Sequence, residues 1–69
     1  MSDTLHEIPN DAQIETVARA FHDSYEELAR MFNYTTRTDT AVPWPLVPEN
    51  NRLLMMAVVR DLYQKGVIT

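Results

Sequence analysis

The chain has 69 residues, a formal net charge of -4 at pH 7 and a hydrophobic share of 45%. This length allows one small domain at most, and the hydrophobic share is too high for a disordered segment. With one glycine and no cysteine, the composition argues against a turn-rich all-β fold and excludes disulfides, thiolate metal sites and thiol catalysis.

The charge is distributed unevenly between the two halves. Residues 1–33 hold seven acidic residues and two arginines, whereas residues 34–69 hold three acidic and four basic residues. Those four basic residues are spread along the chain, which argues against nucleic acid as a partner. The acidic half is typical of a solvated face, although it could also orient two copies or a basic partner. Without a signal peptide or an apolar run near 18 residues, we expect no membrane association and a cytoplasmic location.

The sequence predicts a loosely ordered arm at residues 1–9 and a first helix at about residues 10–33. Asn10 is suited to cap this helix, and Gln13 lies three residues later, as in a capping box. Glu15 and Arg19 are spaced to form an ion pair on the outer face. Apolar residues then recur every three or four positions, which predicts one buried stripe. The stripe comprises Ile14, Val17, Ala18, Phe21, Tyr25, Leu28 and Phe32.

A stiff connector is predicted at residues 34–47, because three of the six residues 43–48 are proline. Trp44 lies between two of these prolines. As a core residue it would close the open end of a helical hairpin against Phe21, Tyr25 and Leu28. As a binding residue it would instead stack on a planar ligand.

A second helix is predicted at about residues 48–65, beginning at Pro48 and ending at a left-handed cap on Gly66. It contains seven consecutive apolar residues, 53–59, which point all the way round a helix. One partner helix covers only one stripe, expected at Leu54, Val58 and Leu62. The remaining side would form an exposed apolar face that binds a second copy or another chain. The predicted interface residues are Met55, Met56, Val59 and Tyr63. Alternatively, the connector and the C-terminal residues fold over that side and make it core.

Two short sequence blocks carry a recognisable pattern. The first is the segment 18–22, Ala-Arg-Ala-Phe-His, with Tyr25 one turn later; the second is Pro43-Trp44 followed by Val47-Pro48-Glu49 and Asn51-Arg52. Together these blocks resemble the small domain that is repeated in ryanodine receptors. The resemblance covers about residues 17–65. The chain departs from the family pattern at Val47, where leucine is usual, and in the apolar run after Arg52.

The resemblance implies a non-catalytic module that packs against protein neighbours or binds a small ligand. Stand-alone copies of such domains resemble those of phages and bacteria, which implies a phage or bacterial source and, for a phage protein, the host cytoplasm.

The candidate chemistry centres on His22. A general base would need an orienting carboxylate and a third reacting group, so we expect a structural histidine that bonds the connector backbone or packs on Trp44, and no enzyme. His22 and Glu26 share a helix face but do not complete a metal site, so neither a metal nor a cofactor is expected.

Two functions therefore remain open. The first is a mainly α, two-helix antiparallel hairpin that dimerises and contacts an unidentified protein. The second is a domain that binds an anionic or nucleotide-like ligand in a cleft around Trp44. The predicted cleft residues, which could serve a ligand or a partner, are His22, Tyr25, Trp44, Asn51 and Arg52.

Overall fold

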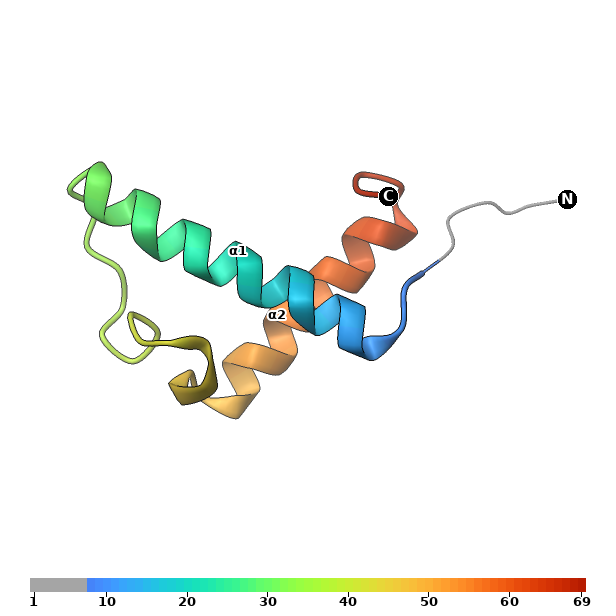
Figure 1. Cartoon of the computed structure of the whole chain (residues 1–69), viewed down its shortest axis with the longest axis horizontal. Helices are drawn as coiled ribbons and strands as arrows, with labels where there is room; N and C mark the ends of the chain where they lie inside the picture. Colours follow the sequence, from blue (N-terminus) through green and yellow to red (C-terminus); the bar gives the residue numbers. More distant parts are fainter. Residues whose placement is uncertain (1–7) are drawn as a thin grey trace, which may run out of the picture.

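The computed structural model describes residues 8–69, and this part of the chain contains helices and no strand (Figure 1). Helix α1 spans Asp11–Met31, a short 3-10 helix η1 spans Trp44–Leu46, and helix α2 spans Glu49–Gln64. Helix α1 contacts both α2 and η1. The predicted mainly α, two-helix hairpin is therefore confirmed. The arm expected at residues 1–9 lies outside the described residues, except for Ile8 and Pro9.

Local sequence signals determine both ends of α1. The Asn10 side chain accepts the backbone N–H of Gln13 at 2.9 Å, which satisfies one of the free donors of the first turn. At the other end Asn33 adopts a left-handed conformation with φ 56°, a region that asparagine tolerates better than most residues. The Tyr34 N–H then bonds the Ala29 carbonyl at 2.7 Å, and the chain leaves the helix axis.

Helix α2 begins after Pro48, whose carbonyl accepts the N–H groups of Asn51 and Arg52. It ends at Gly66, which has a φ of 74° and confirms the predicted left-handed cap. The Val67 N–H returns to the Leu62 carbonyl at 2.9 Å. This turn brings Ile68 against the core.

The core is a small cluster at the point where the two helices cross (Figure 1). Residues from all three elements meet there, and partly buried side chains of α2 surround them. The buried members are Ile14, Ala18, Trp44 and Val59; the partly buried members are Val17, Met55, Met56, Tyr63 and Ile68.

The predicted orientation of α2 is wrong. Val59 is 4% exposed and packs against α1, whereas Val58 is 48% exposed. A helix turns by about 100° per residue, so the inward face lies one residue later in sequence than predicted. The four predicted interface residues therefore pack on or around the core: Met55, Met56, Val59 and Tyr63. The stripe expected to be buried, Leu54, Val58 and Leu62, lies on the side of α2 that lines a groove.

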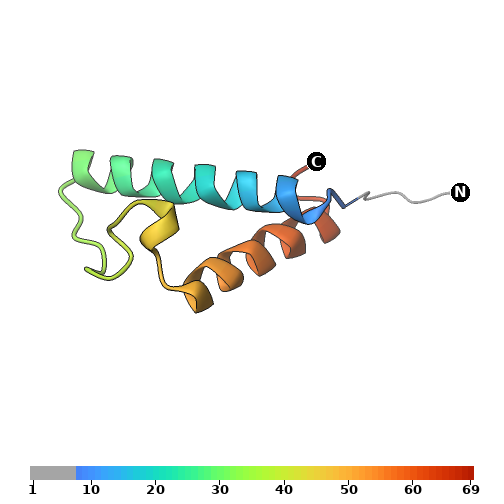
Figure 2. The ribbon, with the colours of Figure 1, turned by 60° about the horizontal axis from the view of Figure 1, so that its bottom comes forward.

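The predicted stripe of α1 is buried only along its first half. Ile14 and Ala18 are fully buried, but Phe21, Tyr25 and Leu28 are about half exposed. The cause is the crossing of the helices, because α2 lies against the N-terminal half of α1 and diverges from it at its own N-terminal end (Figure 2). The connector lies along the second half of α1 instead, where Val42 bonds His22 and Thr36 bonds Glu26. His22 and Ala29 are the buried residues of that half.

Candidate functional site

His22 joins α1 to the connector. Its Nε2 atom lies 2.7 Å from the carbonyl oxygen of Val42, and its ring is 5.8 Å from the Trp44 ring. Because a carbonyl oxygen only accepts, Nε2 carries the proton and donates it. His22 is 4% exposed. The structural role predicted for His22 is therefore confirmed by both of its expected contacts.

Trp44 is likewise a core residue, with 4% exposure. Its Nε1–H donates a hydrogen bond to Glu15 Oε2 at 3.1 Å. The Glu15 carboxylate therefore binds this indole and does not form the predicted ion pair with Arg19. Arg19 lies 4.0 Å from Asp23 instead. The expected packing of Trp44 on Phe21, Tyr25 and Leu28 is wrong, since Trp44 packs with Ile14, Ala18 and Val59.

The five predicted cleft residues do not form one cleft. Tyr25 stacks on Phe21 with ring centroids 6.2 Å apart, on a different part of the surface from Trp44. Arg52 donates its Nε–H to the Val47 carbonyl at 3.0 Å and closes the turn before α2. Asn51 and His22 both line the groove, but Trp44 does not. A planar ligand cannot stack on a tryptophan that is this deeply buried.

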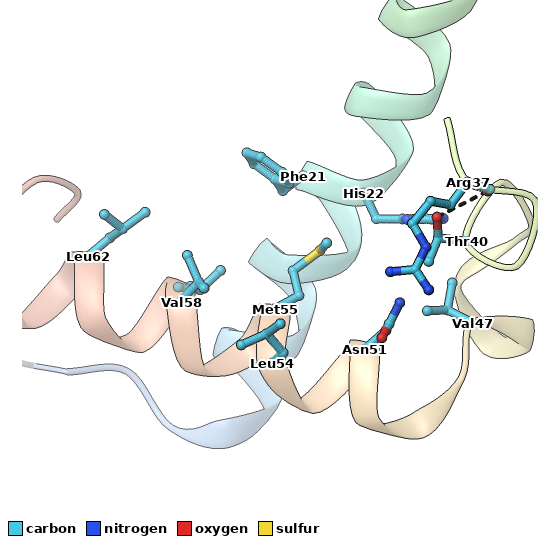
Figure 3. A pocket seen from close by; sticks show the side chains of 11 residues that line it. Phe21, His22, Arg37, Thr40, Val47, Asn51, Leu54, Met55, Val58 and Leu62 are labelled. Atoms are coloured by element: carbon cyan, nitrogen blue, oxygen red, sulfur yellow. Dashed lines mark hydrogen bonds between the residues drawn. The ribbon is translucent and has the colours of Figure 1, made fainter. Parts of the chain in front are cut away.

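A groove of about 290 Å³ lies between α1 and the outer side of α2 (Figure 3). A more polar hollow of about 420 Å³, to which His22 and Trp44 both contribute, lies between α1 and the connector. We name the apolar part of the groove, formed by Phe21, Leu54, Met55, Val58 and Leu62, the apolar groove. Figure 3 shows the Phe21 ring on α1 and the side chains of Val58 and Leu62 on α2 directed toward the same space. Polar side chains of the connector and of the start of α2 close its other end: Arg37, Thr40 and Asn51.

A second apolar feature continues from Phe21 along α1. We name Phe21, Tyr25, Leu28 and Phe32 the α1 strip; these residues recur at steps of four, three and four and lie on one side of the helix. Phe32 is 79% exposed. A hollow of about 270 Å³ lies at the far end of the strip, lined by Tyr25, Leu28, Ala29, Phe32 and Tyr34.

No charged residue interrupts the α1 strip. At about 100° per residue, Asp23, Glu26, Glu27 and Arg30 lie at least about 130° around the helix from its centre. The sequence signal for this strip was present, because its residues form the periodic pattern described above. Periodicity alone predicts that these residues are core, because it does not reveal that the second helix diverges from α1.

Within residues 8–69, no three His, Cys, Asp or Glu side chains lie close enough together to hold a metal ion. In the same range, neither helix combines the length and the apolar character that crossing a bilayer requires.

Comparison with known proteins gives no significant match to a family model, to a curated protein or to a solved structure.

Proposed function

We propose that the protein is a small non-catalytic interaction module that self-associates through its exposed apolar surface and, once assembled, contacts a partner protein. The observation that carries this proposal is the continuous surface made by the α1 strip and the apolar groove, which share Phe21. The interface predicted from the sequence was a face of α2 that packs on or around the core instead. The α1 strip and the apolar groove take its place in this proposal.

The size of the surface favours a second polypeptide as its occupant. From their exposed fractions, the α1 strip together with Leu54 and Val58 leaves roughly 600 Å² of surface exposed. A typical monomer has a largest apolar patch of about 300–600 Å², and a standard interface buries about 800 Å² on each partner. The exposed area of this surface is therefore at the upper limit for a monomer. With a rim of polar residues around it, the area would reach the roughly 800 Å² that each partner buries in a standard interface.

The resemblance to the ryanodine-receptor domain is part of the proposal. The residues that carry the resemblance include His22 and Trp44, and these two side chains pack together at the centre of the fold. Their packing gives the family pattern a structural reason, since it attaches the connector to α1. We therefore propose a stand-alone copy of this domain, acting in the cytoplasm of a bacterium or of a phage host.

The first prediction tests self-association by placing a charge within the α1 strip. Tyr25→Glu should convert the dimer to a monomer, because a buried carboxylate without a partner is costly. Sedimentation equilibrium across a range of protein concentrations measures the change, with the helix content checked by circular dichroism.

Arg30→Glu provides the matched control, because it also introduces an acidic side chain on the same helix, on the opposite and exposed side. It should leave the association unchanged. An unmodified protein that stays monomeric at high concentration would contradict the proposal. Equal weakening by both variants would assign the effect to net charge and not to the α1 strip.

A further inference from the structure

We propose that the second copy docks with the two α1 helices antiparallel, so that Phe32 of each copy inserts into the apolar groove of the other, beside Phe21. This inference rests on the proposed self-association and specifies the contacts that it uses. The two-fold axis would pass between residues 26 and 27, which places Tyr25 opposite Leu28 across the interface.

Symmetry supplies the first argument. In a two-fold interface, if residue i contacts residue j of the other copy, then j also contacts i. Phe21 and Phe32 are the two ends of the α1 strip, so an antiparallel pairing that buries the whole strip must bring one against the other. The four strip positions then form two kinds of contact, Phe21 with Phe32 and Tyr25 with Leu28, and each occurs twice.

The shape of the surface supplies the second argument, because each end of the α1 strip has both a protruding ring and a hollow. The apolar groove lies beside Phe21, and the second hollow lies beside Phe32. In the antiparallel pairing, Phe32 of one copy reaches the groove of the other, and Phe21 reaches the hollow around Ala29. Phe21 and Phe32 are 11 positions apart, which corresponds to about 16.5 Å of helix in both copies, so both insertions occur together.

The end of α1 supplies the third argument. In this pairing, position 35 of one copy would lie opposite Ala18 of the other, and Ala18 is completely covered in the core. A longer helix would therefore collide with the α2 that packs there. Helix α1 ends at Met31, and Asn33 turns the chain away with φ 56°. Helix α1 of each copy therefore ends before the position at which it would collide with α2 of the other copy.

The second prediction tests this register by mixing two charge variants. Phe21→Glu and Phe32→Lys should each weaken the homodimer, because each disrupts two symmetric contacts. In the mixed dimer, one Phe21–Phe32 contact is intact and the other becomes a Glu–Lys pair. We expect the mixed dimer to have a Kd at least about tenfold lower than either homodimer, since the burial of one aromatic ring is regained. Sedimentation equilibrium of the separate and mixed samples measures this.

The matched control is a mixture of Phe21→Glu with Leu28→Lys. It carries the same charges on the same strip, but the new carboxylate at position 21 and the new ammonium group at position 28 would not meet. One Phe21–Phe32 contact is intact here too, yet one Glu–Phe and one Tyr–Lys contact remain, so the Kd of this mixed dimer should lie between those of the two homodimers and not below both. As a second measurement, the unmodified protein in mixed isotope labelling should give intermolecular nuclear Overhauser contacts between Phe21 and Phe32.

The outcomes separate the register from self-association itself. A dimeric unmodified protein whose two mixtures behave alike, without the intermolecular aromatic contacts, overturns the antiparallel register and leaves the proposed function standing. A monomeric unmodified protein overturns both.

Discussion

At the residue scale, His22 and Trp44 hold the connector on α1. The sequence was sufficient to predict a structural role for His22, but it left open whether Trp44 is a core residue or a binding residue. It could not identify their partner atoms, Val42 O and Glu15 Oε2, because these depend on the path of a proline-rich segment without periodicity. For the same reason the sequence does not predict that Glu26 accepts a hydrogen bond from the Thr36 hydroxyl at 2.7 Å.

The third prediction concerns the contribution of His22 to stability. His22→Ala removes a buried ring and leaves the Val42 carbonyl without its donor, so we expect the free energy of unfolding to fall by about 2 kcal/mol or more. Urea unfolding followed by circular dichroism at a fixed protein concentration measures the change. Ser24→Ala, at an exposed position of the same helix, should change it by less than about 0.5 kcal/mol. Similar urea midpoints for the two variants would show that His22 is not a core residue.

At the element scale, the helices themselves were predictable and their faces were not. The Asn10 and Gly66 caps and the breaks at the prolines are local signals, and they place α1 and α2 within two residues of the expected ends. The side that each helix buries depends on the crossing geometry. In α2 the apolar run 53–59 offers several almost equivalent faces. The pattern of apolar residues therefore does not distinguish whether Val58 or Val59 is buried against α1.

The fourth prediction distinguishes the two faces of α2. Val59→Ala should lower the free energy of unfolding by about 2 kcal/mol, because it leaves a cavity beside Ile14 and Trp44. Val58→Ala should lower it by less than about 0.5 kcal/mol when both are made in the monomeric Tyr25→Glu background, where the apolar groove has no occupant. Urea unfolding in that background measures both. A reversed order would restore the face predicted from the sequence.

At the scale of the whole molecule, the fold is only two helices thick. The Cα atoms span 13 Å along the shortest axis, as expected for two helices whose axes lie about 8–10 Å apart. No third layer covers the α1 strip or the outer side of α2 in the described part of the chain. The sequence indicated this shortage of cover from its length and its excess of apolar residues, although it assigned the uncovered surface to the wrong helix face.

The fifth prediction follows from coupling between assembly and folding. If the dimer buries the α1 strip, the free energy of unfolding should rise by about 1.4 kcal/mol per mole of dimer for each tenfold increase in protein concentration, by mass action. Urea midpoints at several concentrations measure this dependence. The Tyr25→Glu variant should show a midpoint that does not change with concentration, and the same invariance in the unmodified protein would indicate a stable monomer.

The position of Trp44 has a practical consequence. It is the only tryptophan, and it lies in the core beside His22, away from the α1 strip. Its fluorescence emission should therefore shift to longer wavelength when the connector detaches from α1, yet stay constant when two folded copies separate. The emission wavelength of Trp44 would therefore measure the integrity of the interior alone, whereas sedimentation would measure the association of two copies.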